Sequence, residues 1–159
     1  MQQISIRRGN LSDAEAIAEC NAAMALETEG LSLDRPQLLG GVRAVLRDSS
    51  KGFYLVAELG GRAVGQMMIT YEWSDWRNGV FWWIQSVYVE PDQRRTGVYT
   101  SLHQHVVEEA QRLGGVCGIR LYVEQENSIA QGVYGALGMN KTVYDMFEVD
   151  FVIQRQSGR

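Results

Sequence analysis

The spacing of apolar residues changes along the chain, and each change predicts a different kind of element. Early apolar positions such as Leu38, Val42 and Val45 recur every three or four residues, which is the period of a helix with one buried face. From Phe53 onward, runs of β-branched and aromatic residues take over, as is typical of strands. Helical spacing returns after Pro91, with apolar residues at Val98, Leu102 and Val106.

These patterns predict ten elements in the order β α α β β β α β α β. The expected strands are residues 4–6, 53–57, 63–71, 80–89, 119–123 and 142–152. Helices are expected after Ser12, after Asp34, from Val98 to Leu113 and after Asn127. Antiparallel hairpins in the middle and one βαβ crossover favour an α/β (mixed α+β) fold: a single mixed, mostly antiparallel sheet with helices on both faces. Without internal repeats or linkers, residues 1–159 are expected to form a single domain.

Several local signals place the boundaries of these elements. Ser12 and Glu15 have the spacing of a capping box, and Asp34 precedes a second helix start. Gly60-Gly61 predicts a two-residue hairpin turn. Residues 73–79 are expected to form a seven-residue loop, and residues 142–152 one long final strand.

Composition and charge narrow the class of protein. The chain has 159 residues, of which 45% are hydrophobic and 21% charged, as in ordinary globular domains and unlike disordered or coiled-coil proteins. A net charge of −4 makes nucleic-acid coating an unfavoured function. With 17 glycines against two prolines, we expect backbone that turns tightly or approaches a ligand closely.

We expect a cytoplasmic protein without a membrane or metal partner. The longest apolar run, residues 80–84, is far shorter than a membrane span, and the first residues lack a signal-peptide core. Cys20 and Cys117 are distant and are expected to be reduced. His103 and His105 are two apart on an expected helix, so they point in different directions and do not favour a zinc site.

The most informative segment joins the strand that ends near Val89 to the helix that starts at Val98. Unpaired amides and partial positive charge make a helix N-terminus a natural phosphate site. Gly97 allows close backbone approach, and Arg94 and Arg95 add cationic donors. From spacing alone, an ordinary β–α turn with two solvated arginines is about equally favoured.

This segment resembles motif A of the GNAT N-acetyltransferase superfamily, V-x-P-x-x-R-x-x-G-[VI]-[GA]-x-x-L. Arg94, Gly97, Val98 and Leu102 match. The resemblance implies that the loop amides bind the pyrophosphate of acetyl-CoA. Tyr99 stands where Gly or Ala is usual, so its side chain either points away from the phosphates or alters their seat.

A second segment, residues 126–139, resembles motif B of the same family, N-x-x-A-x-x-x-Y-x-x-L-G-[FM]. Asn127 and Tyr134 are seven residues apart, so they share one helical face. A tyrosine at this spacing is by itself more often a core residue, but two motifs in the family's order favour a functional one. The residues that the resemblance assigns to the cofactor are Val87, Val89, Arg94, Arg95, Thr96, Gly97, Val98, Tyr99, Asn127 and Tyr134.

The resemblance implies an acetyl-CoA-dependent N-acetyltransferase. The primary amine of a small molecule would attack the thioester directly in a ternary complex, and Tyr134 would donate a proton to the leaving thiolate. Backbone groups of Val87 and Val89 would bind the pantetheine arm. Gln85 lies in the strand where the family often has a carboxylate, and an amide cannot accept the proton of the amine. Several alternatives for the general base therefore remain: Glu27, Glu124 or a water chain, or no base at all if the amine arrives deprotonated.

Acidic and aromatic side chains mark the expected acceptor pocket. Carboxylates beside tryptophans suit a cationic amine, although a solvated helix end and an aromatic hairpin would have the same residues. The candidate acceptor residues are Glu27, Glu29, Trp76, Trp83 and Gln85. Alternative functions are a non-catalytic CoA-binding sensor and a protein lysine or N-terminal acetyltransferase. A long terminal strand is also compatible with a homodimer.

Overall fold

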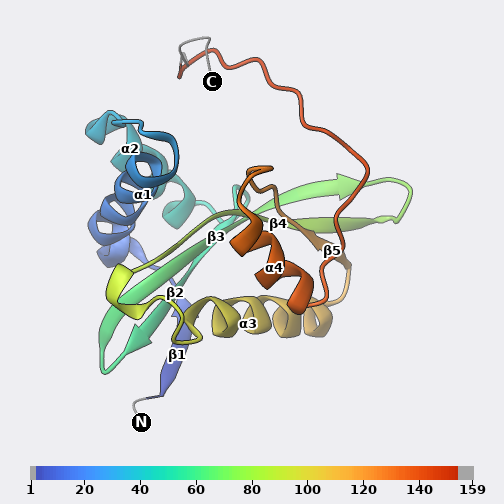
Figure 1. The fold of residues 1–159 in the computed structure, drawn as a ribbon, viewed down its shortest axis with the longest axis horizontal. Helices are drawn as coiled ribbons and strands as arrows, with labels where there is room; N and C mark the ends of the chain where they lie inside the picture. Colours follow the sequence, from blue (N-terminus) through green and yellow to red (C-terminus); the bar gives the residue numbers. More distant parts are fainter. Residues whose placement is uncertain (1–2, 154–159) are drawn as a thin grey trace. The chain divides into compact units, whose positions relative to one another are not determined.

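A computed structural model describes residues 3–153 (Figure 1). The chain divides into two units, Met1–Tyr122 and Val123–Arg159. The elements of the first unit are β1 (Ile4–Arg8), α1 (Ala14–Glu29), α2 (Arg35–Arg47), β2 (Phe53–Leu59), β3 (Arg62–Ser74), β4 (Gly79–Val89), α3 (Val98–Leu113) and β5 (Val116–Arg120). Short 3₁₀ helices lie at Leu11–Asp13 and Pro91–Gln93. In the second unit, α4 covers Ser128–Ala136.

The strands of the first unit form one mixed sheet, as predicted. Their order is β1-β2-β3-β4-β5. The first four strands are paired antiparallel to their neighbours, and β5 is parallel to β4. A parallel neighbour requires a crossover connection, which α3 supplies here.

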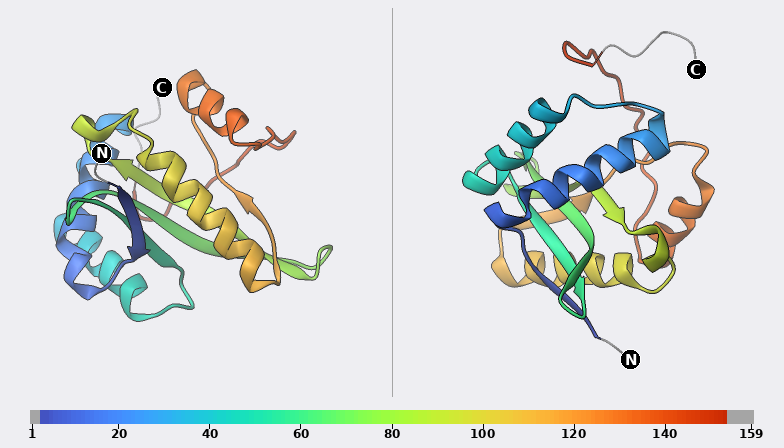
Figure 2. Two further views of the ribbon diagram at one scale, coloured as in Figure 1. Left: turned by 90° about the horizontal axis from the view of Figure 1, so that it is seen from below. Right: turned by 90° about the vertical axis from the view of Figure 1, so that its left-hand side faces the viewer.

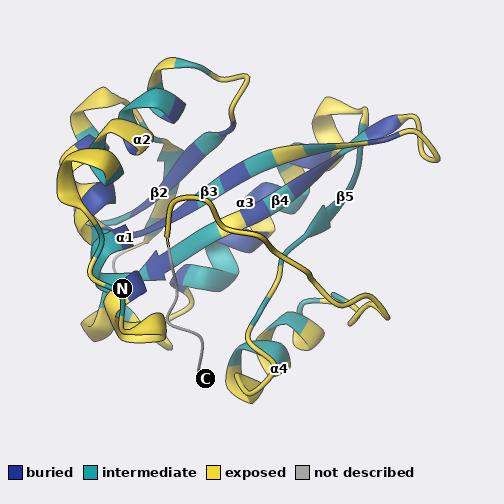
Figure 3. Cartoon of the chain, turned by 90° about the horizontal axis from the view of Figure 1, so that it is seen from above, coloured by how far each residue is buried: buried dark blue, intermediate teal, exposed yellow. Residues whose placement is uncertain are grey.

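The sheet is buried on both faces because helices cover each of them (Figures 2 and 3). In β2, Leu55 and Ala57 belong to the core on the α3 side, whereas Tyr54 and Val56 pack with residues of α1 and α2. This alternation follows from the two-residue period of a strand. The prediction of helices on both faces is confirmed.

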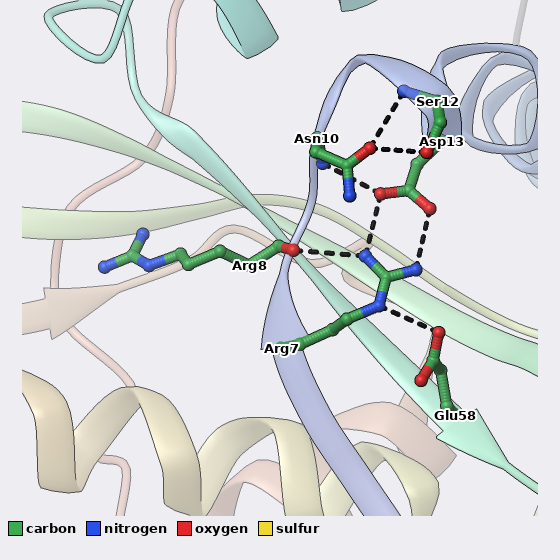
Figure 4. A network of polar contacts seen from close by, with 6 residues as sticks. All are labelled: Arg7, Arg8, Asn10, Ser12, Asp13 and Glu58. Atoms are coloured by element: carbon green, nitrogen blue, oxygen red, sulfur yellow. Dashed lines mark hydrogen bonds and ion pairs between the residues drawn. The ribbon is translucent and has the colours of Figure 1, made fainter. Parts of the chain in front are cut away.

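The start of α1 differs from its prediction, whereas the start of α2 agrees. Asp34 accepts a hydrogen bond from the Gln37 amide at 2.9 Å, as expected of a helix cap. The predicted capping box at Ser12 is wrong. The box is formed two residues earlier, where Asn10 accepts from the Ser12 amide at 2.9 Å and its own amide donates to Asp13 at 2.8 Å. Figure 4 shows that Arg7 also binds Asp13, and this explains why the carboxylate of that residue closes the box.

The hairpin between β2 and β3 is confirmed, and the loop between β3 and β4 is shorter than predicted. Gly60 and Gly61 have φ values of 59° and 79°, the left-handed conformation that a tight primed turn requires. The seven-residue loop predicted at 73–79 is wrong, because Trp73 pairs with Val80 and Ser74 with Gly79. The residues between Ser74 and Gly79 form a turn that stabilises a long hairpin.

The last strand of the sheet lies earlier than the predicted 119–123. β5 pairs with Val80–Trp83 of β4. Gly118 is part of β5, and a Cβ atom at this position would lie only 2.5 Å from the Phe81 ring. The apolar pattern predicted residues 119–123 because a glycine such as Gly118 does not favour a strand. In the structure, Gly118 lies in the strand because only a glycine fits this close to the Phe81 ring.

The final strand predicted at 142–152 is absent from the described residues, so this prediction is wrong. The segment has no regular secondary structure. Asp150 accepts hydrogen bonds from the amides of Val152 and Ile153 at 2.7 and 2.8 Å, which turns the chain locally. Alternating apolar residues predict a strand only where a neighbouring strand is available to pair with it.

Candidate functional site

The loop between β4 and α3 leaves backbone amides open at a helix N-terminus. Gly97 is the N-cap of α3, has φ = 93° and makes no side-chain capping bond. A Cβ atom placed on Gly97 would meet no atom of residues 3–153 within 4 Å, so these residues leave the space beside this backbone open. The first-turn amides of α3, with their partial positive charge, therefore face a space where an anion can approach.

Arg94 in this loop is already bound on two sides. Its Nε donates to the Val89 carbonyl at 3.0 Å, and its Nη2 donates to the Glu27 carboxylate at 2.7 Å. The Tyr88 hydroxyl also donates to Glu27, at 3.2 Å. The ion pair with Glu27 raises the pKa of Arg94 above its ordinary value. Glu27 thus joins the end of α1 to this loop.

The other loop residues fall into exposed and packed groups. Arg95 is exposed and adopts a left-handed φ of 64°. Thr96 is exposed, but its hydroxyl donates to the Gln93 carbonyl at 2.7 Å and so stabilises the loop. Val98 is buried, and Tyr99 packs against the core with its ring 6.1 Å from that of His103.

One edge of β4 is unpaired next to this loop. β5 pairs only with Val80–Trp83, so within the described part of the chain no strand pairs with the second half of β4 on that side. The Glu90 amide donates to Val64 of β3 at 2.9 Å. Because successive residues direct their backbone groups to opposite sides, Val87 and Val89 direct theirs toward the unpaired edge. An extended ligand can add to such an edge by backbone hydrogen bonds.

A bulge in β4 lies just before this open edge. Ile84 pairs with Ile69 and Ser86 with Met68, so Gln85 is the extra residue of the bulge. Gln85 accepts a hydrogen bond from the Thr70 hydroxyl at 3.3 Å. Bulges re-aim side chains and often occur beside functional sites.

Trp83 lies next to this bulge in a polar and aromatic cluster. Its indole nitrogen donates to Glu72 at 2.8 Å, and its ring centroid lies 6.2 Å from that of Tyr122. Arg120 donates to the same Glu72 carboxylate and stacks over Phe81 at 3.6 Å. The cluster therefore combines a fixed carboxylate with aromatic faces.

Sequence reasoning missed Glu72, Thr70 and Arg120. The predicted strand ended at Tyr71, one residue before Glu72, although Thr70 and Glu72 continue its polar alternation. Extending that alternation would have placed both residues on one face. Arg120 was not identifiable in this way, because its position depends on the parallel pairing of β5 with β4.

The predicted acceptor residues are spread over several places. Trp83 and Gln85 lie together near the bulge, whereas Glu27 contacts the loop residue Arg94. Glu29 is the exposed last residue of α1. Trp76 lies in the turn between β3 and β4 and is 87% exposed.

Asn127 and Tyr134 belong to the second unit. The Asn127 side chain accepts from the Ala130 amide at 3.0 Å and so caps α4, as predicted. Tyr134 lies in α4, and burial raises its pKa above the ordinary value. Its phenol is therefore in the protonated form at neutral pH.

Within residues 3–153, no three His, Cys, Asp or Glu side chains are arranged to hold a metal ion. No helix in this range has the length and apolar character needed to cross a membrane. Cys20 and Cys117 are both free thiols.

Comparison with known proteins gives a consistent picture. The family model described as "Acetyltransferase (GNAT) family" matches residues 19–139. A possible acetyltransferase from Clostridium difficile 630 is similar in structure, with 43% sequence identity and a TM-score of 0.87, over 94% of this chain and 99% of the other. A search among curated proteins gave no match.

More distant structures share the fold. The aminoglycoside N-acetyltransferase AAC(6')-Iy in complex with CoA is 18% identical, with a TM-score of 0.77, over 96% of this chain and 97% of the other. The same enzyme in complex with the bisubstrate analogue CoA-S-monomethyl-acetylneamine is 19% identical, with a TM-score of 0.76, over 94% and 99%.

Proposed function

The chain belongs to the acetyltransferase (GNAT) family, and we propose that it transfers an acetyl group from acetyl-CoA to a primary amine of a small molecule. Family membership makes it an N-acetyltransferase. The choice of a small-molecule acceptor is the finer part of the proposal. It is supported by the aminoglycoside N-acetyltransferase AAC(6')-Iy, a distant structural relative that was solved with the bisubstrate analogue CoA-S-monomethyl-acetylneamine.

The observation that carries the proposal is the unpaired edge of β4 directly before an open helix N-terminus. In this proposal the pyrophosphate binds to the amides around Gly97, with Arg94 and Arg95 as cationic partners. Thr96 and the backbone of Val98 and Tyr99 complete this loop. The pantetheine arm lies along β4 and bonds the backbone of Val87 and Val89.

The chain's own residues then serve the chemistry. Acetyl-CoA supplies an activated acetyl group as a thioester. The amine nitrogen forms the new C–N bond as the C–S bond breaks, and an amide of β4 stabilises the charge on the carbonyl oxygen. Tyr134 gives its phenol proton to the leaving thiolate, and its raised pKa keeps that proton available at neutral pH. Asn127 caps α4, the helix that carries Tyr134.

The proton of the acceptor amine leaves to water in this proposal. Glu27 is not the proposed base, because its two carboxylate oxygens already accept hydrogen bonds from Tyr88 and Arg94. Glu124 is exposed to solvent, so water can carry a proton to it. Trp83 and Gln85 bind the acceptor, with Glu72 fixing the indole, while Glu29 and Trp76 extend the acceptor surface.

Titration calorimetry with acetyl-CoA tests this binding mode. We expect micromolar affinity in the natural protein and at least about tenfold weaker binding in Gly97→Val, because the new side chain blocks backbone approach and strains a left-handed residue. Gly30→Val is a matched control, since Gly30 is also left-handed and open but lies at the end of α1. Equal affinity of Gly97→Val and Gly30→Val for acetyl-CoA would show that the loop around Gly97 does not bind the cofactor.

Turnover separates this function from its alternatives. An assay of thiol release with a panel of primary amines should show activity that Tyr134→Phe lowers at least about tenfold. Binding of acetyl-CoA without turnover of any amine would favour a sensor. Acetylated peptides from a lysate, without small-amine activity, would favour a protein acetyltransferase.

We also propose a cytoplasmic homodimer that binds neither nucleic acid nor membrane. The two free thiols support a location in a reducing compartment. The net charge of −4 supports the proposal that the protein does not bind nucleic acid. Association is supported by the apolar residues between 142 and 152, of which Val143, Phe147 and Phe151 are each more than 90% exposed. Exposed apolar surface of this kind marks interaction sites.

A further inference from the structure

A groove of about 430 Å³ lies between α1 and the sheet. Neither Trp83 nor Gln85, the proposed acceptor residues, lines it. Its apolar wall consists mainly of small side chains, which leave the space open. Those residues are Ala16, Ile17, Ala23, Val56 and Ala63. The proposed acetyl transfer uses none of them.

Three carboxylates line the groove, and two of them are already paired with an arginine. Asp13 binds the Arg7 guanidinium through two bonds of 2.8 Å, and Glu19 pairs with Arg35. Glu90 is half-buried and has no ion pair with any residue in the range 3–153. Glu90 is therefore the carboxylate of this groove that is left for a cationic ligand.

A buried amide in the same groove has an unused acceptor. Gln66 lines the groove and is only 2% exposed. Its Nε2 donates to Asn21 at 2.8 Å, but its Oε1 has no hydrogen-bond partner among residues 3–153. A buried polar atom without a partner is costly, so a donor that enters the groove would be stabilised there.

Glu90 and Gln66 are near neighbours on one face of the sheet. Gln66 pairs with Tyr88 across β3 and β4, and Glu90 follows Tyr88 by two residues. All three line the groove, so their side chains share a face. Diagonal neighbours of this kind are roughly 7–8 Å apart at their Cα atoms, which lets one small group contact both side chains.

The half-buried thiol of Cys20 also lines the groove, close enough to Glu90 and Glu19 to be affected by their charges. Burial raises its pKa to about 11, and the charges of Glu90 and Glu19 contribute in the same direction. The same potential that disfavours a thiolate favours a cation.

We propose that this groove binds a small organic cation, a primary alkylammonium, which donates to the Glu90 carboxylate and to Oε1 of Gln66. The hydrocarbon part of the ligand lies against the small apolar side chains of α1 and β2. A metal ion does not fit this description, because the groove lacks three ligating side chains in suitable positions. A neutral alcohol of the same length would lose the charge-assisted bond.

An NMR titration of the full chain with hexylammonium chloride, without acetyl-CoA, tests the proposal independently of acetyl transfer. We expect saturable amide shifts on residues 16–23 and 63–66. Glu90→Gln should weaken binding at least about tenfold, and Gln66→Met about threefold to tenfold. Glu108→Gln, which removes a carboxylate from α3 outside the groove, is the matched control and should bind as the natural protein does.

Three outcomes would overturn the proposal. One is equal affinity for hexylammonium and hexanol, which would show apolar binding only. Another is unchanged affinity in Glu90→Gln. The third is a set of shifts centred on Trp83 and Gln85, or no saturation at all. If Gln66→Met fails to fold, the comparison with hexanol and the Glu90→Gln variant still test the proposal. If hexylammonium does not bind, the result of the acetyl-CoA titration is not affected.

Discussion

Arg94 shows at the scale of a single residue how the cofactor loop is prepared. Its guanidinium is held by Glu27 and by the Val89 carbonyl. This arrangement orients the side chain but also neutralises its charge. In the proposed function, a phosphate group has to compete with the Glu27 carboxylate for the same cation.

Removing that competitor should strengthen cofactor binding. We expect Glu27→Gln to bind acetyl-CoA up to about fivefold more tightly, since an exposed ion pair is worth at most about 1 kcal/mol. Calorimetry at constant ionic strength measures the change. Glu15→Gln, which breaks the exposed pair with Arg43 elsewhere on α1, should leave the affinity unaltered. Weaker binding in Glu27→Gln would show that orientation of Arg94 matters more than its free charge.

At the scale of elements, the structure separates segments that pair from a segment that does not. The strands β1 to β5 each pair with a neighbour, whereas residues 142–152 have strand-like alternation without a ladder. Val143, Phe147 and Phe151 fall on one side of that alternation, and Tyr144 and Met146 on the other. A partner strand from a second copy would bury the first side in the proposed dimer.

Substitutions on the two sides should therefore differ. We expect the natural chain to be a dimer by light scattering at micromolar concentration. The double variant Phe147→Ser with Phe151→Ser should shift the mass toward the monomer, because it removes apolar area from the buried side. The variant Tyr144→Ser with Met146→Ser should stay dimeric. A monomeric natural protein would contradict the homodimer.

At the scale of the whole molecule, a network around Arg7 ties β1 to β2 and to the start of α1 (Figure 4). Arg7 binds Asp13 and Glu58, each at 2.8 Å. Hydrogen bonds from Arg7 are the main reason that the pKa of Asp13 is lowered, and the pKa of Arg7 is raised in turn. The network couples stability to pH.

The sign of this coupling follows from the lowered pKa of Asp13. Its stabilisation is complete above the unfolded-state pKa of about 3.9 and is lost as the pH falls through the folded-state value. We expect Asp13→Asn to lower the free energy of unfolding by about 2 kcal/mol at pH 7 and to flatten the decline below about pH 4. Urea denaturation across pH measures both effects. Asp92→Asn, in an exposed pair with Arg62, should change little, and an equal loss there would contradict a special role for Asp13.

The sequence by itself determined the mixed sheet, the helices on both faces and the loop around Gly97. These features depend on local signals: the period of apolar residues, the Gly60-Gly61 turn and the Asp34 cap, each read within a few residues. The two family motifs are local for the same reason. Glu72 was not predicted as a site residue, because the predicted strand 63–71 ended one residue before it.

Only the tertiary structure decided which groups meet. The unpaired edge of β4, the contact of Glu27 with Arg94 and the groove at Gln66 and Glu90 join residues far apart in the chain. The position of β5 depends on the packing of Gly118 against Phe81. Residues 142–152 form no strand because no neighbouring strand in residues 3–153 pairs with them. Backbone pairing and side-chain contact are long-range interactions, and local periodicity carries no information about their partners.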